Sequence, residues 1–167
     1  DQLMGKANMN VLFRLLLACT SILAFAGMSL ANHHLSAEHS PSLHDQILTL
    51  DTHIDIPIEL GLEDADPGLD GPMQVDLPKM REGGLDSGFF IVYVGQGAVT
   101  EEGYAQAYQK AQDKFAAIER MLAMYPDQIQ LATTPDQLEA IVNEGKLAAA
   151  IGVENAYPLG PDLAHLQ

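Results

Sequence analysis

Residues 87–94 read Ser-Gly-Phe-Phe-Ile-Val-Tyr-Val, an apolar run that is rich in β-branched and aromatic side chains. A continuous run of this kind is typical of a strand buried on both faces, as strands of parallel sheets are. Residues 147–153, Leu-Ala-Ala-Ala-Ile-Gly-Val, form a second such run. The sequence therefore predicts at least two strands of a parallel sheet, each buried on both faces.

Helical patterns lie beside these two runs. Apolar residues recur at spacings of three and four over residues 101–125, and Pro126 ends the pattern, which predicts a long helix. A short helix stopped by glycines is expected at 75–84, and a short strand at 129–132. A capping threonine followed by proline opens a further helix at 134–145. Strands that alternate with helices in this way indicate a parallel α/β fold.

A polar cluster follows the apolar residues 47–50, which we expect to be a short strand. Asp51, His53 and Asp55 stand at alternate positions, so on a regular strand all three side chains point to one face. An imidazole beside carboxylates is a half-site for a divalent metal ion, although a strand end with solvated polar residues has the same pattern. Glu154 follows the second buried run in a matching position, at the strand end where an α/β barrel places its active site.

The charge of the chain excludes one class of partner. Its 167 residues carry 23 acidic against 8 basic side chains, a formal charge of −15, and no basic cluster is present to neutralise phosphates. Nucleic-acid binding is therefore not expected. The acidic segment 59–71 is expected to be a solvated surface loop, because its spacing does not fit a calcium-binding EF-hand.

The N-terminal residues 1–31 have the pattern of an upstream extension and a signal peptide. From Met9 a weakly basic start with Arg14 leads into an almost wholly apolar stretch that ends in Ser-Leu-Ala, which predicts cleavage after Ala31 and a secreted or periplasmic protein. A retained membrane anchor is one alternative. A lipoprotein attached through Cys19 is another. Residues 32–45 are then a polar linker before the globular part.

Several motifs in register resemble the membrane (renal-type) dipeptidases. They are Leu-Asp-Thr-His-Ile-Asp-Ile-Pro at 50–57, Asp-Leu-Pro-Lys-Met-Arg-Glu-Gly-Gly at 76–84, Phe-Phe-Ile-Val-Tyr at 89–93, the segment 118–126, Glu-Gly-Lys-Leu at 144–147 and Ile-Gly-Val-Glu at 151–154. The resemblance covers about residues 45–167. One departure is visible, because the family often has Gly-Gly-His after the glutamate, whereas Asn-Ala-Tyr-Pro follows Glu154 here. This difference points to a divergent subgroup.

The resemblance implies the N-terminal part of a (β/α)8 TIM-type barrel, with residues 46–167 as a truncated first portion. It implies two zinc ions, with His53 and Asp55 as ligands of one ion and Glu154 as the carboxylate that bridges both and takes part in catalysis. Two further histidine ligands and the proton donor are expected beyond Gln167. By this resemblance Asp51 orients His53 or the loop without binding metal. His165 is read as a surface residue of a helical tail.

The activity implied is hydrolysis of the peptide bond of dipeptides through a hydroxide that bridges the two zinc ions, with a dipeptide as the partner. A second copy of the chain is a further candidate partner, and membrane contact is expected only through the signal peptide or a lipid anchor. Two alternatives stay open. One is an amidohydrolase-type enzyme that acts on a lactam, a lactone or an N-acyl amino acid. The other is a non-catalytic exported binding protein.

Overall fold

The computed structural model describes residues 42–161 and 163–166. The expected signal peptide, its cleavage site at Ala31, Cys19 and most of the polar linker lie outside the described residues. Within the described part no helix is both long enough and apolar enough to cross a membrane.

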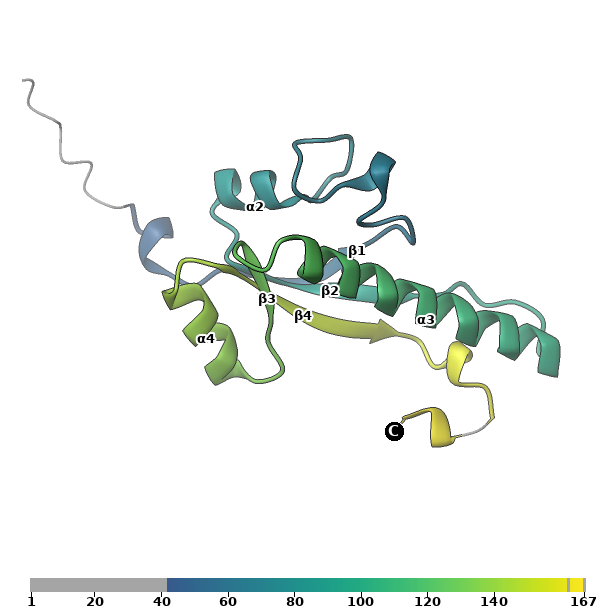
Figure 1. The fold of residues 1–167 in the computed structure, drawn as a ribbon. Coiled ribbons are helices and arrows are strands. Elements are labelled where there is room, and N and C mark those ends of the chain that lie inside the picture. Colours follow the sequence, from purple (N-terminus) through teal and green to yellow (C-terminus); the bar gives the residue numbers. More distant parts are fainter. Residues whose placement is uncertain (1–41, 162, 167) are drawn as a thin grey trace, which may run out of the picture. The chain divides into compact units, whose positions relative to one another are not determined.

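A four-stranded, all-parallel sheet organises the described residues (Figure 1). Its strands are β1 (Leu50–Asp55), β2 (Ser87–Tyr93), β3 (Ile129–Leu131) and β4 (Leu147–Glu154), and their order across the sheet is β1-β2-β4-β3. The helices between them are α2 (Leu77–Gly83), α3 (Glu101–Met124) and α4 (Pro135–Asn143). The described residues also form short 3₁₀ helices, which are η1 (His44–Gln46), η2 (Glu63–Ala65), η3 (Tyr157–Leu159) and η4 (Leu163–Leu166). The predicted parallel α/β fold is confirmed.

Each of the three helices begins at a capping side chain, and of these caps the sequence predicted Thr134. Asp76, Thr100 and Thr134 are the N-caps of α2, α3 and α4, and each side chain accepts a hydrogen bond from a backbone amide three residues on. Gly84 ends α2 with φ 66°, the left-handed conformation that glycine adopts without steric cost. The apolar stripe of α3 faces the sheet, and Ile118 and Met121 are among its buried side chains.

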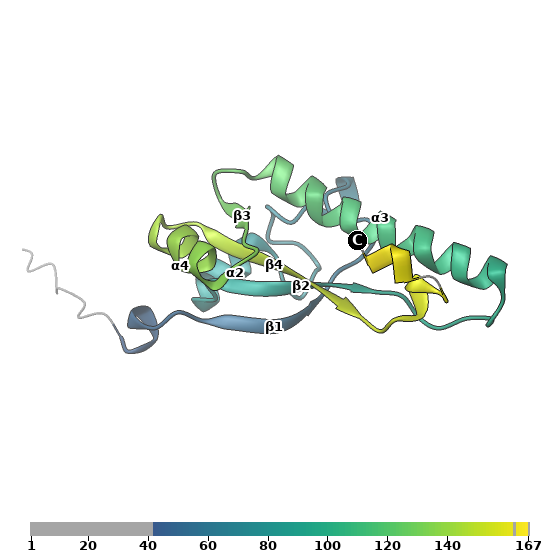
Figure 2. The same cartoon turned by 90° about the horizontal axis from the view of Figure 1, so that it is seen from below.

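The main core lies between the sheet and α3. It joins Ile54 of β1, Phe90 and Val92 of β2 and Leu147 and Ala149 of β4 to the buried side of the helix. A second, smaller cluster joins Ala148 of β4 to Ile141 of α4. Because Ala148 lies between Leu147 and Ala149 on a strand, its side chain points to the opposite face of the sheet. Helices α3 and α4 therefore cover opposite faces of the sheet, and α4 covers only the start of β4 (Figure 2).

The expectation that residues 147–153 are buried on both faces is right only for their first half. Residues 147–150 are buried, Ile151 and Gly152 are half-buried, and Val153 and Glu154 are exposed. The reason is that β3 pairs only with the first three residues of β4, and α4 covers only that end. Further along, the face opposite α3 opens into an apolar hollow of about 620 Å³, lined among others by Leu50, Phe89 and Leu138.

The first strand differs from its prediction in position. It runs over Leu50–Asp55 instead of residues 47–50, because β2 begins at Ser87, which pairs with Leu50. Ile47 and Leu48 therefore precede the sheet and are exposed. The strand thus contains the whole polar cluster, which the sequence pattern placed at the end of a strand.

A bulge in β1 changes which face Asp51 occupies. Asp51 pairs with Gly88 and Ile54 pairs with Phe90, so three steps along β1 match two steps along β2. The prediction that Asp51 shares a face with His53 and Asp55 is therefore wrong, because the extra residue reverses the alternation. Asp51 lies on the face of Ile54, toward α3, while His53 and Asp55 remain on the other face.

Candidate metal centre

Three side chains from two strands converge at the carboxyl ends of the sheet. His53 Nε2 lies 3.5 Å from Asp55 Oδ1 and 3.3 Å from Glu154 Oε2. One nitrogen or oxygen from each residue lies within 4.8 Å of those of the other two. The structure therefore brings together His53, Asp55 and Glu154, the three residues that the sequence selected as metal ligands.

Sheet register accounts for this convergence. Asp55 pairs with Ile91, and Glu154 pairs with Tyr93 two residues further along the same strand. Positions two apart on a strand share a face, so both carboxylates and the ring of Tyr93 are presented on the same side of the sheet. The imidazole of His53 then reaches across the end of β2 to Glu154. The arrangement depends on β2 lying between the two ligand-bearing strands.

The three groups are open to solvent, as a site that admits a substrate must be. Their side chains are 51%, 75% and 45% exposed for His53, Asp55 and Glu154. One imidazole nitrogen and two carboxylates are a donor set that zinc accepts. The residues present therefore fit a divalent metal ion in type, number and spacing.

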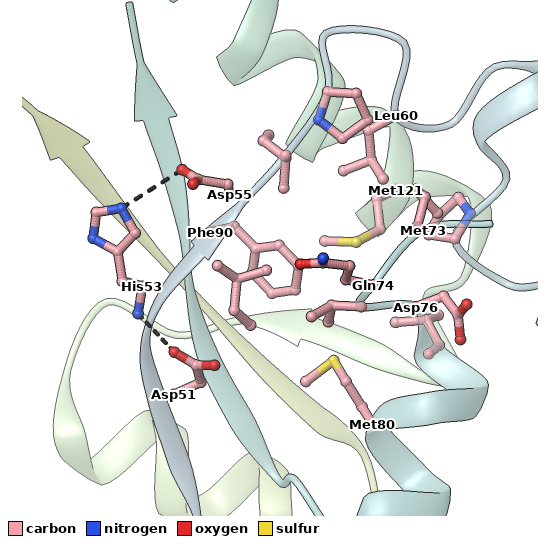
Figure 3. A pocket seen from close by; sticks show the side chains of 16 residues that line it. Asp51, His53, Asp55, Leu60, Met73, Gln74, Asp76, Met80, Phe90 and Met121 are labelled. Carbon is pink, nitrogen blue, oxygen red and sulfur yellow. Dashed lines mark hydrogen bonds and ion pairs between the residues drawn. The ribbon is translucent and has the colours of Figure 1, made fainter. Parts of the chain in front are cut away.

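Asp51 contacts the backbone of His53, and no contact joins it to the imidazole ring. Its Oδ1 accepts a hydrogen bond of 2.8 Å from the His53 amide (Figure 3). In a bulge, one strand residue loses its ladder partner, so this side chain replaces a missing backbone acceptor. The prediction that Asp51 orients His53 agrees with this contact. Asp51 acts on the main chain of His53 and not on its ring.

Two cations of α3 hold the segment that follows Asp55. Lys114 Nζ donates to the Ile56 carbonyl at 2.7 Å, and Arg120 donates to the carbonyls of Ile58 and Leu60 at 2.8 and 3.2 Å. Alternate carbonyls of this segment are thereby satisfied by charged donors. Sequence reasoning missed both residues, and the helical stripe pattern gives no signal for them because it concerns apolar positions.

The same segment, residues 56–76, borders a cavity of about 350 Å³ on the helix side of β1 (Figure 3). Met73, Met80 and Met121 supply part of its apolar wall. His53 and Asp55 belong to its lining, together with core residues such as Leu77 and Phe90.

Part of the predicted acidic loop is anchored to the protein. Glu63, Asp64 and Asp70 are exposed, as expected of a solvated loop. Asp66 is half-buried and accepts a hydrogen bond from the Tyr125 hydroxyl at 2.5 Å. The hydrogen bond that the Tyr125 hydroxyl donates to Asp66, together with burial, raises the pKa of Tyr125 above its usual value.

A second anchor of this loop is the carboxylate of Asp76, which is buried and pairs with Lys79. Burial alone would raise the pKa of Asp76. Hydrogen bonds from the Lys79 ammonium and from the amides of Lys79 and Gly71 outweigh burial and hold that pKa below its usual value. Lys79 also pairs with Asp70 at 2.8 Å, and both carboxylates raise the pKa of its ammonium.

His165 lies apart from the metal-ligand candidates. It belongs to η4, is exposed, stacks on Tyr108 with ring centroids 4.4 Å apart, and its Nδ1 lies 2.9 Å from the Leu159 carbonyl oxygen. The prediction of a surface residue outside the ligand set agrees with this position.

A comparison with protein families matches residues 37–167 to the membrane dipeptidase family, peptidase family M19. The chain belongs to this family. The resemblance found in the sequence motifs is thereby confirmed, and the family is one of metal-dependent dipeptidases.

Solved structures share the fold of the chain. The probable dipeptidase PvdM from Pseudomonas aeruginosa is 29% identical, with a TM-score of 0.70 over 74% of this chain and 32% of that one. The dipeptidase AC, a metallo peptidase, is 24% identical with a TM-score of 0.59, over 72% of this chain and 40% of that one. A metallo peptidase from Rhodobacter sphaeroides, liganded with a phosphinate mimic of the dipeptide L-Ala-D-Ala, is 22% identical with a TM-score of 0.58, over 72% and 41%. The chain spans about a third of the length of PvdM.

Proposed function

We propose that this chain is the first portion of a zinc-dependent dipeptidase in which His53, Asp55 and Glu154 bind metal. The observation that supports the proposal most is the meeting of these three side chains at the carboxyl ends of β1 and β4, inside the region that matches the family. In parallel α/β sheets this is the end at which active sites are built.

The proposal includes closure of the sheet into a (β/α)8 barrel by further strands. Support comes from the open face, where the apolar hollow beside Leu50, Phe89 and Leu138 exposes surface that an α/β barrel fills with interior side chains. The outer edge of β4 after Ala149 is also without a strand partner among the described residues. A parallel strand paired with this edge of β4 would cover both the unpaired edge and the apolar hollow.

The roles of this chain's own residues follow from their positions. His53 and Asp55 would hold one ion, and Glu154 would share its two carboxylate oxygens between that ion and a second one. When bound, two zinc ions polarise the scissile carbonyl and lower the pKa of a shared water, so that hydroxide is available at neutral pH. Asp51 fixes the main chain of His53, and the Lys114 ammonium fixes the carbonyl that follows Asp55. These contacts keep His53 and Asp55 in place before any substrate arrives.

A dipeptide is the proposed substrate. The Rhodobacter sphaeroides metallo peptidase is liganded with a mimic of L-Ala-D-Ala, and we extend this to propose that a D-residue is accepted at the C-terminal position here. The protein is further proposed to be exported, on the strength of the apolar segment before Ala31. N-terminal sequencing of the exported form tests this, with Asn32 as the expected first residue and a lipidated Cys19 as the contrary result.

Metal content and a substrate panel test the function. The complete gene product, purified with zinc, should hydrolyse L-Ala-L-Ala or L-Ala-D-Ala and should lose activity in a chelator. His53→Ala and Asp55→Ala should each lose one equivalent of metal. Turnover of N-acyl amino acids, lactones or lactams without dipeptide turnover would favour another hydrolase of this type. Unchanged metal content in both ligand variants would contradict the site.

A further inference from the structure

The backbone changes direction immediately after Glu154. Asn155 has φ 64°, and it is the one non-glycine residue with a positive φ in the described part of the chain. Few non-glycine residues adopt this left-handed conformation, and asparagine is among the most tolerant of them. This turn lies directly beside a proposed metal ligand. The side chain of Asn155 makes hydrogen bonds that offset the conformational free energy of the left-handed backbone.

The Asn155 carboxamide uses both of its ends in those contacts. Its Nδ2 donates to the Val94 carbonyl at 3.1 Å, and its Oδ1 accepts from the Tyr157 amide at 2.9 Å. Backbone pairing of β2 with β4 ends at Tyr93 and Glu154. The side chain therefore continues the connection between the two strands by one residue, beyond the point where the ladder stops.

Tyr157 extends the connection to the loop that follows β2. Its hydroxyl donates to the Ala98 carbonyl at 2.7 Å, and its ring packs against Tyr104 of α3 with centroids 5.2 Å apart. Gly103 leaves room for this hydrogen bond, because a Cβ at this position would lie 2.1 Å from the Ala98 carbonyl oxygen and 2.9 Å from the Tyr157 hydroxyl. The turn after Glu154 is thus joined to β2, to the loop before α3 and to α3 itself.

We propose that Asn155 is a positioning residue for Glu154. The inference rests on the proposed function, since it assigns Glu154 to the metal. Glu154 is the last residue of β4, and its carboxylate meets His53 only while the ends of β2 and β4 stay together. Asn155 holds them together through its Nδ2, which donates to the Val94 carbonyl, while its Oδ1 fixes the turn itself by accepting from the Tyr157 amide. Glycine can adopt the same φ without either contact, and aspartate can keep the acceptor but not the donor.

The test compares Asn155→Gly and Asn155→Asp with wild type in the complete gene product. Asn143→Gly, at the exposed end of α4, is the matched control for loss of an asparagine side chain. The measurements are the zinc dissociation constant by competition with a chelator, kcat and KM for L-Ala-D-Ala, and the Tm of the metal-free protein. Both Asn155 variants should bind zinc roughly tenfold more weakly and lower kcat by a similar factor, with KM little changed. The control should match wild type.

The outcomes separate this inference from the proposed function. If Asn155→Gly lowers Tm but keeps the wild-type zinc affinity and kcat, the role is structural and the inference is overturned. If wild type binds zinc but does not hydrolyse dipeptides, the proposed function fails, and the zinc affinities of the variants still decide the inference. If wild type binds no zinc, both are wrong.

Discussion

The two strand ends that carry the metal-ligand candidates are held in different ways. After Asp55 of β1, the chain is held from a distance, by Lys114 and Arg120 of α3, which lie about sixty residues away in the sequence. After Glu154 of β4, the chain is held by its own side chains, because Asn155 and Tyr157 donate to the carbonyls of Val94 and Ala98. The first arrangement depends on long flexible cations, and the second depends on a backbone turn beside the ligand itself.

The difference shows where each half of the site is sensitive to change. Long cationic side chains can shift and still reach a carbonyl, so the β1 side should tolerate small displacements of α3. A left-handed turn closed by one carboxamide has a single suitable geometry. The β4 side should therefore be the more rigid half, and substitutions that test each side should differ in their effects.

The largest effect is expected when the ligands themselves are changed. Asp55→Asn should remove one equivalent of zinc, whereas Glu154→Gln should weaken both ions, because a neutral amide does not bridge two cations well. Each should lower kcat/KM by roughly a thousand-fold, equivalent to several kcal/mol of transition-state stabilisation. Metal analysis and steady-state kinetics on the complete gene product measure both effects. Equal metal loss in the two variants would remove the distinction between the two strand ends.

The next effect concerns the distant support of β1. Arg120→Met should lower the free energy of unfolding by about 2 kcal/mol, because two carbonyls lose a charged donor. Lys114→Met should lower it by about 1 kcal/mol and should also weaken zinc binding by a small factor, since its acceptor adjoins Asp55. Lys110→Met, on an exposed position of the same helix, is the control. Chemical denaturation gives the free energies. A Lys110 effect as large as that of Lys114 would show that net charge, and not the contact, is responsible.

A pH-dependent effect of similar or smaller size is expected at Asp76. Its pKa in the folded protein lies below the usual value of 3.8, so the charged form stabilises the fold above about pH 3.8. This contribution should disappear as the pH falls through the lower folded-state pKa. Asp76→Asn keeps an N-cap oxygen but removes the charge that pairs with Lys79, and should cost about 1.5 kcal/mol at pH 7. Denaturation curves from pH 7 to pH 2.5 should show wild type and variant converging at low pH. Parallel curves would contradict the assignment.

The smallest effect is expected at the far end of the loop after β1. Tyr125→Phe removes the hydroxyl that donates to Asp66 and should lower the free energy of unfolding by about 1 kcal/mol. Zinc affinity should be unchanged, because this contact is remote from Asp55 in the chain and supports only the outer part of the loop. Thermal denaturation and the chelator competition test the two statements. A loss of zinc affinity in this variant would mean that the whole loop moves as one unit with the ligands.

The sequence predicts most of the fold because its local signals agree with one another. The apolar run at 87–94, the capping Thr134 and the glycine after α2 each specify an element that the structure contains. Asp55 and Glu154 could be selected because each ends a strand of a parallel sheet, and His53 because it stands two residues before Asp55. The face of Asp51 could not be predicted, since one extra residue in β1 depends on how β2 pairs with it.

The supporting contacts were harder to predict for a related reason. Lys114 and Arg120 look like ordinary solvated positions of an amphipathic helix, and only the path of the loop after β1 brings carbonyls to them. Asn155 was noticed as a departure from the family pattern, but the sequence did not show that its side chain joins two strands. Such contacts arise from tertiary geometry, and periodicity does not report them.

The bulge in β1 also bears on how related chains can differ in length. In a regular strand, the loss or gain of one residue would turn every following side chain to the wrong face. Here the pairs Asp51 with Gly88 and Ile54 with Phe90 enclose one residue more than β2 supplies. A chain that lacked Thr52 could restore regular pairing and still present His53 and Asp55 on the open face. This strand is therefore a place where a single-codon deletion can occur in evolution without loss of the ligand pair.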